Sequence, residues 1–295
     1  MAVVLAIPGS EEQAIQLGAR LDVAVITPEV RRFPDGEIYV RIDCDLRGHD
    51  AVLVGSLYPA PAERFMTMAF VAATARDLGA RRVGLVAPYL AFMRQDVQFK
   101  PGEGVTSTYF AQLVSRTVDW MVTVDPHLHR HASLDELYTI PTEIARAAPS
   151  IAAWVSEEVD RPVLIGPDAE SVQRVSAVAA HCGAPFVILE KTRRGERDVS
   201  ITSPGGAWAG HTPVVIDDIV STGKTMIEAT RQLVAAGSAA PMCVAIHAVF
   251  ADSVLDELTS AGAAGIITCD TIVHASNRIS VADPIAEAAR GFLVS

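Results

Sequence analysis

The stretch 213–228 limits most strongly what this chain can fold into. It begins with the apolar run 213–216, continues with Asp217 and Asp218, and passes through a hydroxyl- and glycine-rich segment into a helical pattern. This order predicts a buried strand, a loop and a helix that opens at Thr225. Paired carboxylates beside an apolar strand are unfavourable without partners, so a merely polar turn is the weaker interpretation. We therefore expect a binding loop here.

The residues of this loop are suited to a phosphate. They are Ser221, Thr222, Gly223, Lys224 and Thr225. Glycine lets the backbone approach a ligand, the hydroxyl groups donate, and the start of a helix offers N–H groups and a positive dipole end. The loop G-x-x-x-x-G-K-[ST] that cradles triphosphates would need glycine at Asp218. A sugar monophosphate fits better, with Asp217 and Asp218 accepting from ribose hydroxyls or reaching Mg²⁺.

Composition excludes several classes of protein. The chain has 295 residues, of which 50% are hydrophobic and 20% charged, so we expect about two globular domains. The net charge of −11 disfavours partners that are phosphate polymers or membrane surfaces, so we expect no nucleic-acid or membrane partner. Anionic small substrates would then need local arginines, lysines and Mg²⁺.

The cellular compartment is predicted from the spacing of the cysteines and from the apolar run near the start of the sequence. The run 3–7 is too short for a secretory signal, lacks a basic region before it and stops at Pro8-Gly9. Cys44, Cys182, Cys243 and Cys269 show no C-x-x-C spacing, which favours free thiols in a reducing cytoplasm. We therefore expect a cytoplasmic protein without a membrane helix.

Strand-like and helical patterns alternate along the whole chain. Strands are expected at 3–7, 23–26, 51–56, 83–87, 120–124, 163–165, 186–189, 214–216, 242–249 and 266–268. Helices are expected at 11–20, 61–78, 170–182, 224–236 and 253–261. This alternation predicts an α/β protein with mainly parallel sheets flanked by helices, in two similar tandem domains of residues 1–141 and 142–295. Ligands bind at the carboxyl ends of strands in such sheets.

Two segments of the first half carry polar residues around turns. Residues 31–42 contain the turn signal Pro34-Asp35-Gly36 before an alternating strand pattern, which predicts a hairpin or loop. Residues 94–107 contain Arg94-Gln95-Asp96 before a proline- and glycine-rich loop, and Ser107 is a possible cap of the next helix. Arg94, Gln95 and Asp96 could contact a base edge or a phosphate, although a solvated loop would have a similar sequence.

Three histidines, His127, His129 and His131, follow a predicted strand with a period of two. The spacing is compatible with metal ligands, including those of zinc hydrolases. A zinc site would need further histidines at strand ends, and of the others only His247 lies in a strand-like run. A single histidine is usually a surface residue, but His127, two residues after Asp125 at a strand end, is harder to dismiss as one.

Two segments of the second half complete the candidates. Asp168 follows the buried strand at 163–165 and could share a cation with His127 if the domains face each other. Residues 190–198 form a dense run of opposite charges that includes Lys191 and Arg193. Such a run is usually a solvated surface, but its cations could also fold over a polyphosphate.

Together the segments resemble the ribose-phosphate pyrophosphokinase (PRPP synthetase) family over essentially the whole chain. The resemblance rests on Phe-x-Asp-Gly-Glu at 33–37, Arg-Gln-Asp at 94–96, Asp-x-His at 125–127, Pro-Asp at 167–168, Lys-x-Arg at 191–193 and Asp-Asp-Ile-Val-Ser-Thr-Gly-x-Thr at 217–225. Each motif is weak alone, whereas six in the family's order are specific.

The resemblance implies two tandem type I phosphoribosyltransferase-like domains and transfer of a diphosphoryl group from ATP to ribose 5-phosphate with Mg²⁺. The implied ATP-binding residues are Phe33, Asp35, Gly36, Glu37, Arg94, Gln95 and Asp96. The implied ribose 5-phosphate-binding residues are Asp217, Asp218, Ser221, Thr222, Gly223, Lys224 and Thr225. His127 and Asp168 match metal ligands, and Lys191 and Arg193 match a catalytic loop. The family also implies a homo-oligomer, a dimer or a hexamer of dimers, with ATP often bound between subunits.

Some residues depart from the common bacterial pattern. Ser221 stands where bacterial members have aspartate, and with residues 99–103 it is nearer to the archaeal type. Regulation by phosphate or ADP is therefore not implied. Two alternatives remain: a non-catalytic regulator related to the synthetases, and a phosphoribosyltransferase. The first would usually carry insertions or altered motifs, and the second would not need the motifs at 33–37 and 94–96.

Overall fold

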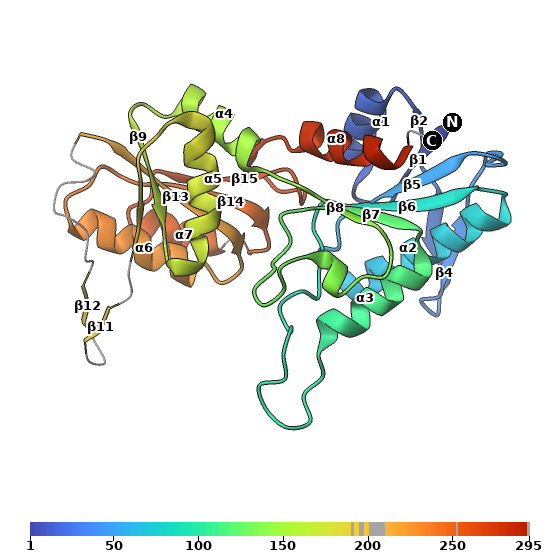
Figure 1. The fold of residues 1–295 in the computed structure, drawn as a ribbon, viewed down its shortest axis with the longest axis horizontal. Coiled ribbons are helices and arrows are strands. Elements are labelled where there is room, and N and C mark those ends of the chain that lie inside the picture. The colour runs from blue at the N-terminus through green and yellow to red at the C-terminus, as the bar shows by residue number, and fades with distance from the viewer. Residues whose placement is uncertain (190–191, 195–197, 201–209, 252, 294–295) are drawn as a thin grey trace. The chain divides into compact units, whose positions relative to one another are not determined.

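The computed structural model describes residues 1–189, 192–194, 198–200, 210–251 and 253–293. The chain divides into two compact units. Unit 1 contains residues 1–146 and 281–295, and unit 2 contains residues 147–280 (Figure 1). Among the helices of the described ranges, none combines the length and apolar composition that a bilayer crossing requires.

Unit 1 is built on a parallel six-stranded sheet with the order β2-β1-β5-β6-β7-β8. The strands are β1 (Ala2–Ala6), β2 (Ala24–Ile26), β5 (Asp50–Val54), β6 (Arg82–Ala87), β7 (Trp120–Val124) and β8 (Thr142–Ala145). Helices α1 (Glu11–Leu21) and α8 (Ala282–Leu293) cover one face, and α2 (Pro61–Asp77) and α3 (Thr106–Thr117) cover the other (Figure 1). Because both faces are covered, the central strands are continuous apolar runs.

Unit 2 repeats this topology with a parallel sheet of order β10-β9-β13-β14-β15-β16. The strands are β9 (Pro162–Gly166), β10 (Phe186–Ile188), β13 (Thr212–Val220), β14 (Met242–Ala248), β15 (Gly265–Cys269) and β16 (Asn277–Ile279). The helices are α4 (Ala148–Glu158), α5 (Val172–Cys182), α6 (Lys224–Ala235) and α7 (Ser253–Ser260). The prediction of two similar parallel α/β domains is confirmed.

Each unit also inserts a two-stranded hairpin between its second and third sheet strands in chain order. In unit 1 the hairpin joins β3 (Glu29–Arg32) to β4 (Ile38–Arg41), and in unit 2 the antiparallel pair is β11 (Thr192–Arg194) and β12 (Asp198–Ser200). The two pairs are therefore inserted at equivalent points of the repeated topology, with Phe33 between β3 and β4 and Arg193 within β11.

The helix that follows the last strand of each sheet packs in the other unit. Helix α4 follows β8 but packs on α5, whereas α8 follows β16 but packs on α1, β7 and β8. The ring of Phe292 in α8 stacks on Trp120 of β7, with centroids 4.7 Å apart. Residues 142–146 and 281–295 thus belong to unit 1, whereas the sequence alone suggested one cut after residue 141. The order of patterns along a chain does not reveal which sheet a helix covers.

The buried carboxylate of Asp50, 3% exposed, joins three parts of unit 1. Its Oδ1 accepts from Nε of Arg81 at 2.9 Å, and its Oδ2 accepts from Nη2 of Arg82 at 2.6 Å. The same Nη2 of Arg82 donates to the carbonyl of Phe292 in α8 at 2.8 Å. Burial alone would raise the pKa of Asp50, but the hydrogen bonds and charges of the two arginines outweigh it and lower the pKa to about 2.

We expect Asp50→Asn to destabilise unit 1 by about 2.6 kcal/mol at pH 7, the linkage value for a pKa lowered from about 3.9 to about 2. A lowered folded-state pKa stabilises above the unfolded-state pKa, and the contribution is lost as the pH falls. About half of the difference between variant and wild type should therefore be gone at pH 3. Urea unfolding of both proteins at several pH values measures this, and a difference that stays constant down to pH 3 would contradict it.

Candidate active site

Strand β13 carries Asp217 and Asp218 inside it, which corrects the expectation that they follow the strand. The pairing of β13 with β14 continues as far as Val220, opposite Ala248, whereas its pairing with β9 ends at Val215. Among the described strands, only β14 therefore pairs with the last part of β13.

Each of the two carboxylates accepts from the backbone N–H of the residue that follows it. Oδ1 of Asp217 accepts from the N–H of Asp218 at 2.9 Å, and Oδ1 of Asp218 accepts from the N–H of Ile219 at 2.8 Å. Both side chains also contact Arg174, a residue of α5. Burial, and next the negative charge of Asp218, raise the pKa of Asp217, while the positive charge of Arg174 opposes the rise. The strand end thus holds two neighbouring acids that share the guanidinium of Arg174.

The turn at 221–223 leads directly into α6. Gly223 has φ +68°, and a Cβ there would lie 2.5 Å from Cγ1 of Val254, so both the backbone and the space require glycine. Among the described residues, no side chain caps α6. The N–H groups of its first turn lack intrahelical acceptors, and Ser221, Thr222 and Thr225 stand around them. This is the geometry expected of a phosphate site.

Asp168 lies at the end of β9, the strand beside β13, and therefore at the same edge of the unit 2 sheet. Its Oδ1 accepts from the N–H of Glu170 at 3.1 Å, and its carbonyl accepts from Oγ of Ser171 at 2.6 Å. These bonds form the short 3₁₀ turn η2 (Ala169–Ser171) that precedes α5. The predicted metal ligand and the predicted sugar-phosphate loop thus share one edge.

His127 lies at the corresponding edge of unit 1, after β7. Asp125, two residues before it, has φ +30° and pairs with Arg146 at 3.1 Å. The rings of His127 and His129 are 5.0 Å apart, and Nδ1 of His131 is 2.9 Å from the carboxylate of Glu136. No cluster of three or more metal-binding side chains occurs in the described part of the chain, so the zinc-hydrolase alternative finds no support there. His127 and Asp168 belong to different units, and their sharing of a cation stays a prediction.

The hairpin β3–β4 presents Phe33 at its turn. The N–H of Phe33 donates to the carbonyl of Glu37 at 2.9 Å, and Gly36 has φ +93°. The ring is 41% exposed, with the guanidinium of Arg31 at 5.0 Å from its centroid and the Tyr39 ring edge-on at 6.1 Å. An aromatic ring held this way offers its free face for stacking.

An open groove of about 590 Å³ runs between this hairpin and α2. Arg32 donates to the carbonyl of Gly36 at 2.7 Å and pairs with Glu63 of α2, so the hairpin is fixed to the helix. Asp35 accepts from the N–H of Glu37 at 3.1 Å. The carboxylate of Asp35 therefore stabilises the turn that carries the motif.

The loop after Asp96 is held by two acids. Asp96, whose side chain is 4% exposed, accepts from Nη1 of Arg130 at 2.7 Å, and that guanidinium lies 5.3 Å from the centroid of the Phe99 ring. Glu103 accepts from the N–H groups of Phe99 and Lys100, both at 2.9 Å. The loop is therefore tied to the segment that follows His127.

Arg94 is exposed next to this loop, and the carbonyl of Gln95 accepts from the N–H of Ser107 at 3.2 Å. Ser107 lies inside α3, buried, and does not cap it; the residue before the helix is Val105. In Figure 1 the loop and the β3–β4 hairpin lie apart, with α2 and α3 between them. The hairpin and the loop between β6 and α3, which carry the predicted ATP-binding residues, thus lie in different parts of unit 1.

The predicted catalytic loop falls at the edge of what the structure describes. Lys191 lies outside the described residues. Arg193 belongs to β11, for which only the backbone is described.

The residue that sequence reasoning missed is Arg174, because an arginine in an amphipathic helix is usually read as solvent-exposed.

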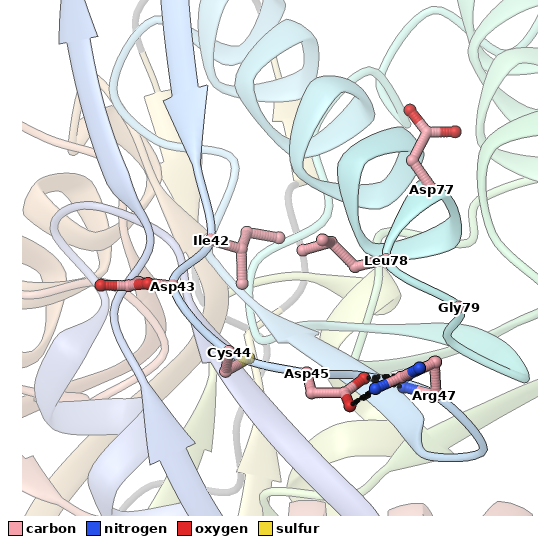
Figure 2. Close-up of a pocket in the computed structure, with 8 residues that line it drawn as sticks. All are labelled: Ile42, Asp43, Cys44, Asp45, Arg47, Asp77, Leu78 and Gly79. Carbon is pink, nitrogen blue, oxygen red and sulfur yellow. Dashed lines mark hydrogen bonds and ion pairs between the residues drawn. The ribbon is translucent and has the colours of Figure 1, made fainter.

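A second hollow of about 690 Å³ in unit 1 contains none of the predicted residues (Figure 2). Asp43, Asp45 and Asp77 line it, and its arginine, Arg47, pairs with Asp45 at 2.5 Å. Hydrogen bonds from Arg47 lower the pKa of Asp45 to about 2, so that acid stays charged. The excess of carboxylates makes this hollow unsuited to a phosphorylated ligand.

Comparison with known proteins identifies the family. A family model for the N-terminal domain of ribose phosphate pyrophosphokinase matches residues 2–117, and one for the phosphoribosyl transferase domain matches residues 133–283. The ribose-phosphate pyrophosphokinase of Methanopyrus kandleri is 34% identical over 288 residues, which cover 97% of this chain and 98% of that protein. The chain belongs to the ribose-phosphate pyrophosphokinase family.

Two further relatives support this membership. The ribose-phosphate pyrophosphokinase of Sulfurisphaera tokodaii is 30% identical over 266 residues, 89% of this chain and 90% of that protein. The crystal structure of phosphoribosylpyrophosphate synthetase from Mycobacterium smegmatis superposes with a TM-score of 0.84 at 25% identity, over 99% of both chains. The fold is thus that of the family, with two type I phosphoribosyltransferase-like units.

Proposed function

We propose that this protein transfers the β,γ-diphosphoryl group of ATP to the C1 hydroxyl of ribose 5-phosphate, giving PRPP and AMP. The single observation that carries the proposal is the end of β13, where the partly buried Asp217 and the buried Asp218 adjoin an uncapped helix start with a glycine at φ +68°. The acids suit the ribose hydroxyls, and the N–H groups suit the 5-phosphate.

The reaction needs positioning and charge neutralisation more than covalent chemistry. The bond between O1 of the sugar and the β-phosphorus forms while the bond to the α-phosphate oxygen breaks, and AMP leaves. In this account Lys191 and Arg193 neutralise the transferring diphosphate, while residues 217–225 hold the acceptor sugar. The hairpin with Phe33, Asp35, Gly36 and Glu37, together with Arg94, Gln95 and Asp96, holds the adenine nucleotide.

Mg²⁺ fits the donors available. This ion keeps several waters and takes one or two carboxylates together with substrate phosphates, so it does not need a cage of protein ligands. Asp168, with a carboxylate at the phosphate edge of unit 2, is the stronger ligand, and His127 is the weaker because imidazole is a less usual partner of Mg²⁺. When bound, the ion would neutralise charge on the phosphates of ATP.

The separation of the two nucleotide-binding segments favours a site shared between chains. Because Figure 1 draws the hairpin and the loop between β6 and α3 apart, we propose that ATP binds between two copies, as in a dimer or a hexamer built from dimers. We place the enzyme in the cytoplasm, where ATP and ribose 5-phosphate are available and thiols stay reduced. Its net charge of −11 gives no reason to expect nucleic acid as a partner.

Phe33→Ala should raise the Michaelis constant for ATP through lost base stacking, by roughly tenfold for a loss of about 1–2 kcal/mol, with kcat less affected. Phe33→Leu is the matched control because it keeps apolar area without an aromatic face. Steady-state kinetics with ATP varied at saturating ribose 5-phosphate measures the change.

An ATP site formed by residues of two subunits predicts a further result, for mixtures of variants. At ATP concentrations well below the raised Michaelis constant of Phe33→Ala, mixing these subunits with Lys191→Ala subunits should increase activity, since one kind of site then contains both intact residues. Mixed oligomers verified by mass spectrometry that gain no activity would contradict a site shared between subunits.

The proposed function is tested by incubating the protein with ATP, Mg²⁺ and ribose 5-phosphate and following AMP. We expect AMP only when ribose 5-phosphate is present. A phosphoribosyltransferase would instead consume PRPP and a base without ATP, and a non-catalytic regulator would produce no AMP. Either outcome would overturn the proposal.

A further inference from the structure

Arg174 joins both acids of the β13 end by separate nitrogen atoms. Its Nη1 lies 3.3 Å from Oδ1 of Asp217, and its Nη2 lies 3.1 Å from Oδ2 of Asp218. The three side chains are 21%, 17% and 12% exposed, so little solvent screens the contacts. A planar guanidinium can bridge two carboxylates in this way, whereas a lysine ammonium acts as a point charge.

The pair of acids needs such a partner. Asp217 and Asp218 are neighbours in one strand, where successive side chains point to opposite faces, yet both reach the same arginine. Their negative charges repel each other, and burial adds to the penalty of ionisation. A single guanidinium offsets one of the two charges and holds both carboxylates in a fixed direction. Each carboxylate has about four lone-pair positions and so keeps capacity to accept from a ligand hydroxyl.

The position of Arg174 is itself set by the turn that contains Asp168. That carboxylate caps η2, and α5 starts directly after it at Val172, so Arg174 lies in the first turn of the helix. A Cβ at Gly166 would lie 2.3 Å from Oγ of Ser171, so strand and helix pack closely at this point. The same short segment therefore fixes Asp168 on one side and Arg174 on the other.

We propose that Arg174 is a positioning residue of the ribose 5-phosphate site, which keeps the carboxylates of Asp217 and Asp218 aligned to accept from the sugar hydroxyls. The inference rests on the proposed function for the identity of the ligand. Arg174 acts through the two acids and does not touch ATP. Its removal should weaken sugar binding selectively and leave nucleotide binding nearly intact.

The test compares Arg174→Met, Arg174→Lys and the control Arg231→Met, which removes an exposed arginine from α6 in the same unit. Titration calorimetry of ribose 5-phosphate without nucleotide gives the dissociation constant directly. We expect Arg174→Met to raise it by about 10- to 100-fold, as for loss of a charge-assisted contact. Arg174→Lys should restore part of the loss, because it returns the charge but not the bridge, and Arg231→Met should match wild type.

Kinetics with thermal melts separates positioning from folding. In Arg174→Met the Michaelis constant for ribose 5-phosphate should rise, while that for ATP changes less than about threefold. If the methionine variant melts well below wild type, the lysine variant carries the comparison. Ribose 5-phosphate binding within twofold of wild type in Arg174→Met, or equal losses for both substrates, would overturn the inference. Wild-type protein that binds ribose 5-phosphate but forms no AMP would refute the proposed function and leave the role of Arg174 in sugar binding standing.

Discussion

Lys191→Ala should lower kcat by a factor on the order of 10² or more, as does removal of one preorganised charge donor from a transition state. The diphosphoryl group is negatively charged throughout the transfer. A cation that closes over this group therefore stabilises mainly the transition state. The antiparallel pair β11–β12 begins directly after Lys191, at the point of unit 2 where unit 1 inserts its Phe33 hairpin. Affinity for ribose 5-phosphate and the melting temperature should barely change.

The controls for Lys191 separate charge from structure. Lys191→Arg keeps the positive charge and should retain more activity than the alanine variant. Arg193→Ala should resemble Lys191→Ala, and the double variant should lose less than the sum if both side chains act on one transition state. A Lys191→Ala enzyme with near-normal kcat would remove the catalytic-loop assignment, whatever happens to Arg193.

Asp217→Ala and Thr222→Ala should weaken ribose 5-phosphate binding more than ATP binding. The first removes a carboxylate that accepts from the sugar, for which the loss of a hydrogen bond to a charged group predicts about 10- to 100-fold. The second removes a hydroxyl beside the start of α6 and should have a smaller effect in the same direction.

Matched variants keep this result interpretable. Asp217→Asn preserves the shape of the side chain and removes its charge, and Thr259→Ala removes an exposed hydroxyl from α7 as the control. Michaelis constants for both substrates, measured in each variant, decide the question. Equal losses for ATP and ribose 5-phosphate in Asp217→Ala would count against a sugar-specific site.

Much of this arrangement could be predicted because the central strands are fully buried. Apolar runs such as Trp120–Val124 mark strands covered on both faces, and the turns after them mark the ligand edge. The apolar run before Asp217 likewise predicts the motif at 217–225, although β13 extends farther than the sequence predicts. Its extension depends on pairing with β14, which no local pattern reveals.

Other features depend on contacts between distant residues and stayed hidden. Nothing in the sequence shows that the last helix returns to stack Phe292 on Trp120 in unit 1. Arg174 and Asp217 are 43 residues apart, and their contact follows only once α5 is placed beside β13. Sequence patterns thus predict elements and strand ends, whereas the partners of charged side chains require the tertiary structure.

The central claim is transfer of an intact diphosphoryl group, and phosphorus NMR of the complete reaction tests it most directly. With ATP, Mg²⁺ and ribose 5-phosphate, we expect AMP and a single new diphosphate ester in equal amounts, in which the former β-phosphorus is bonded to O1 of the sugar. Formation of ADP with a singly phosphorylated C1, or release of inorganic phosphate without a sugar diphosphate, would contradict the account.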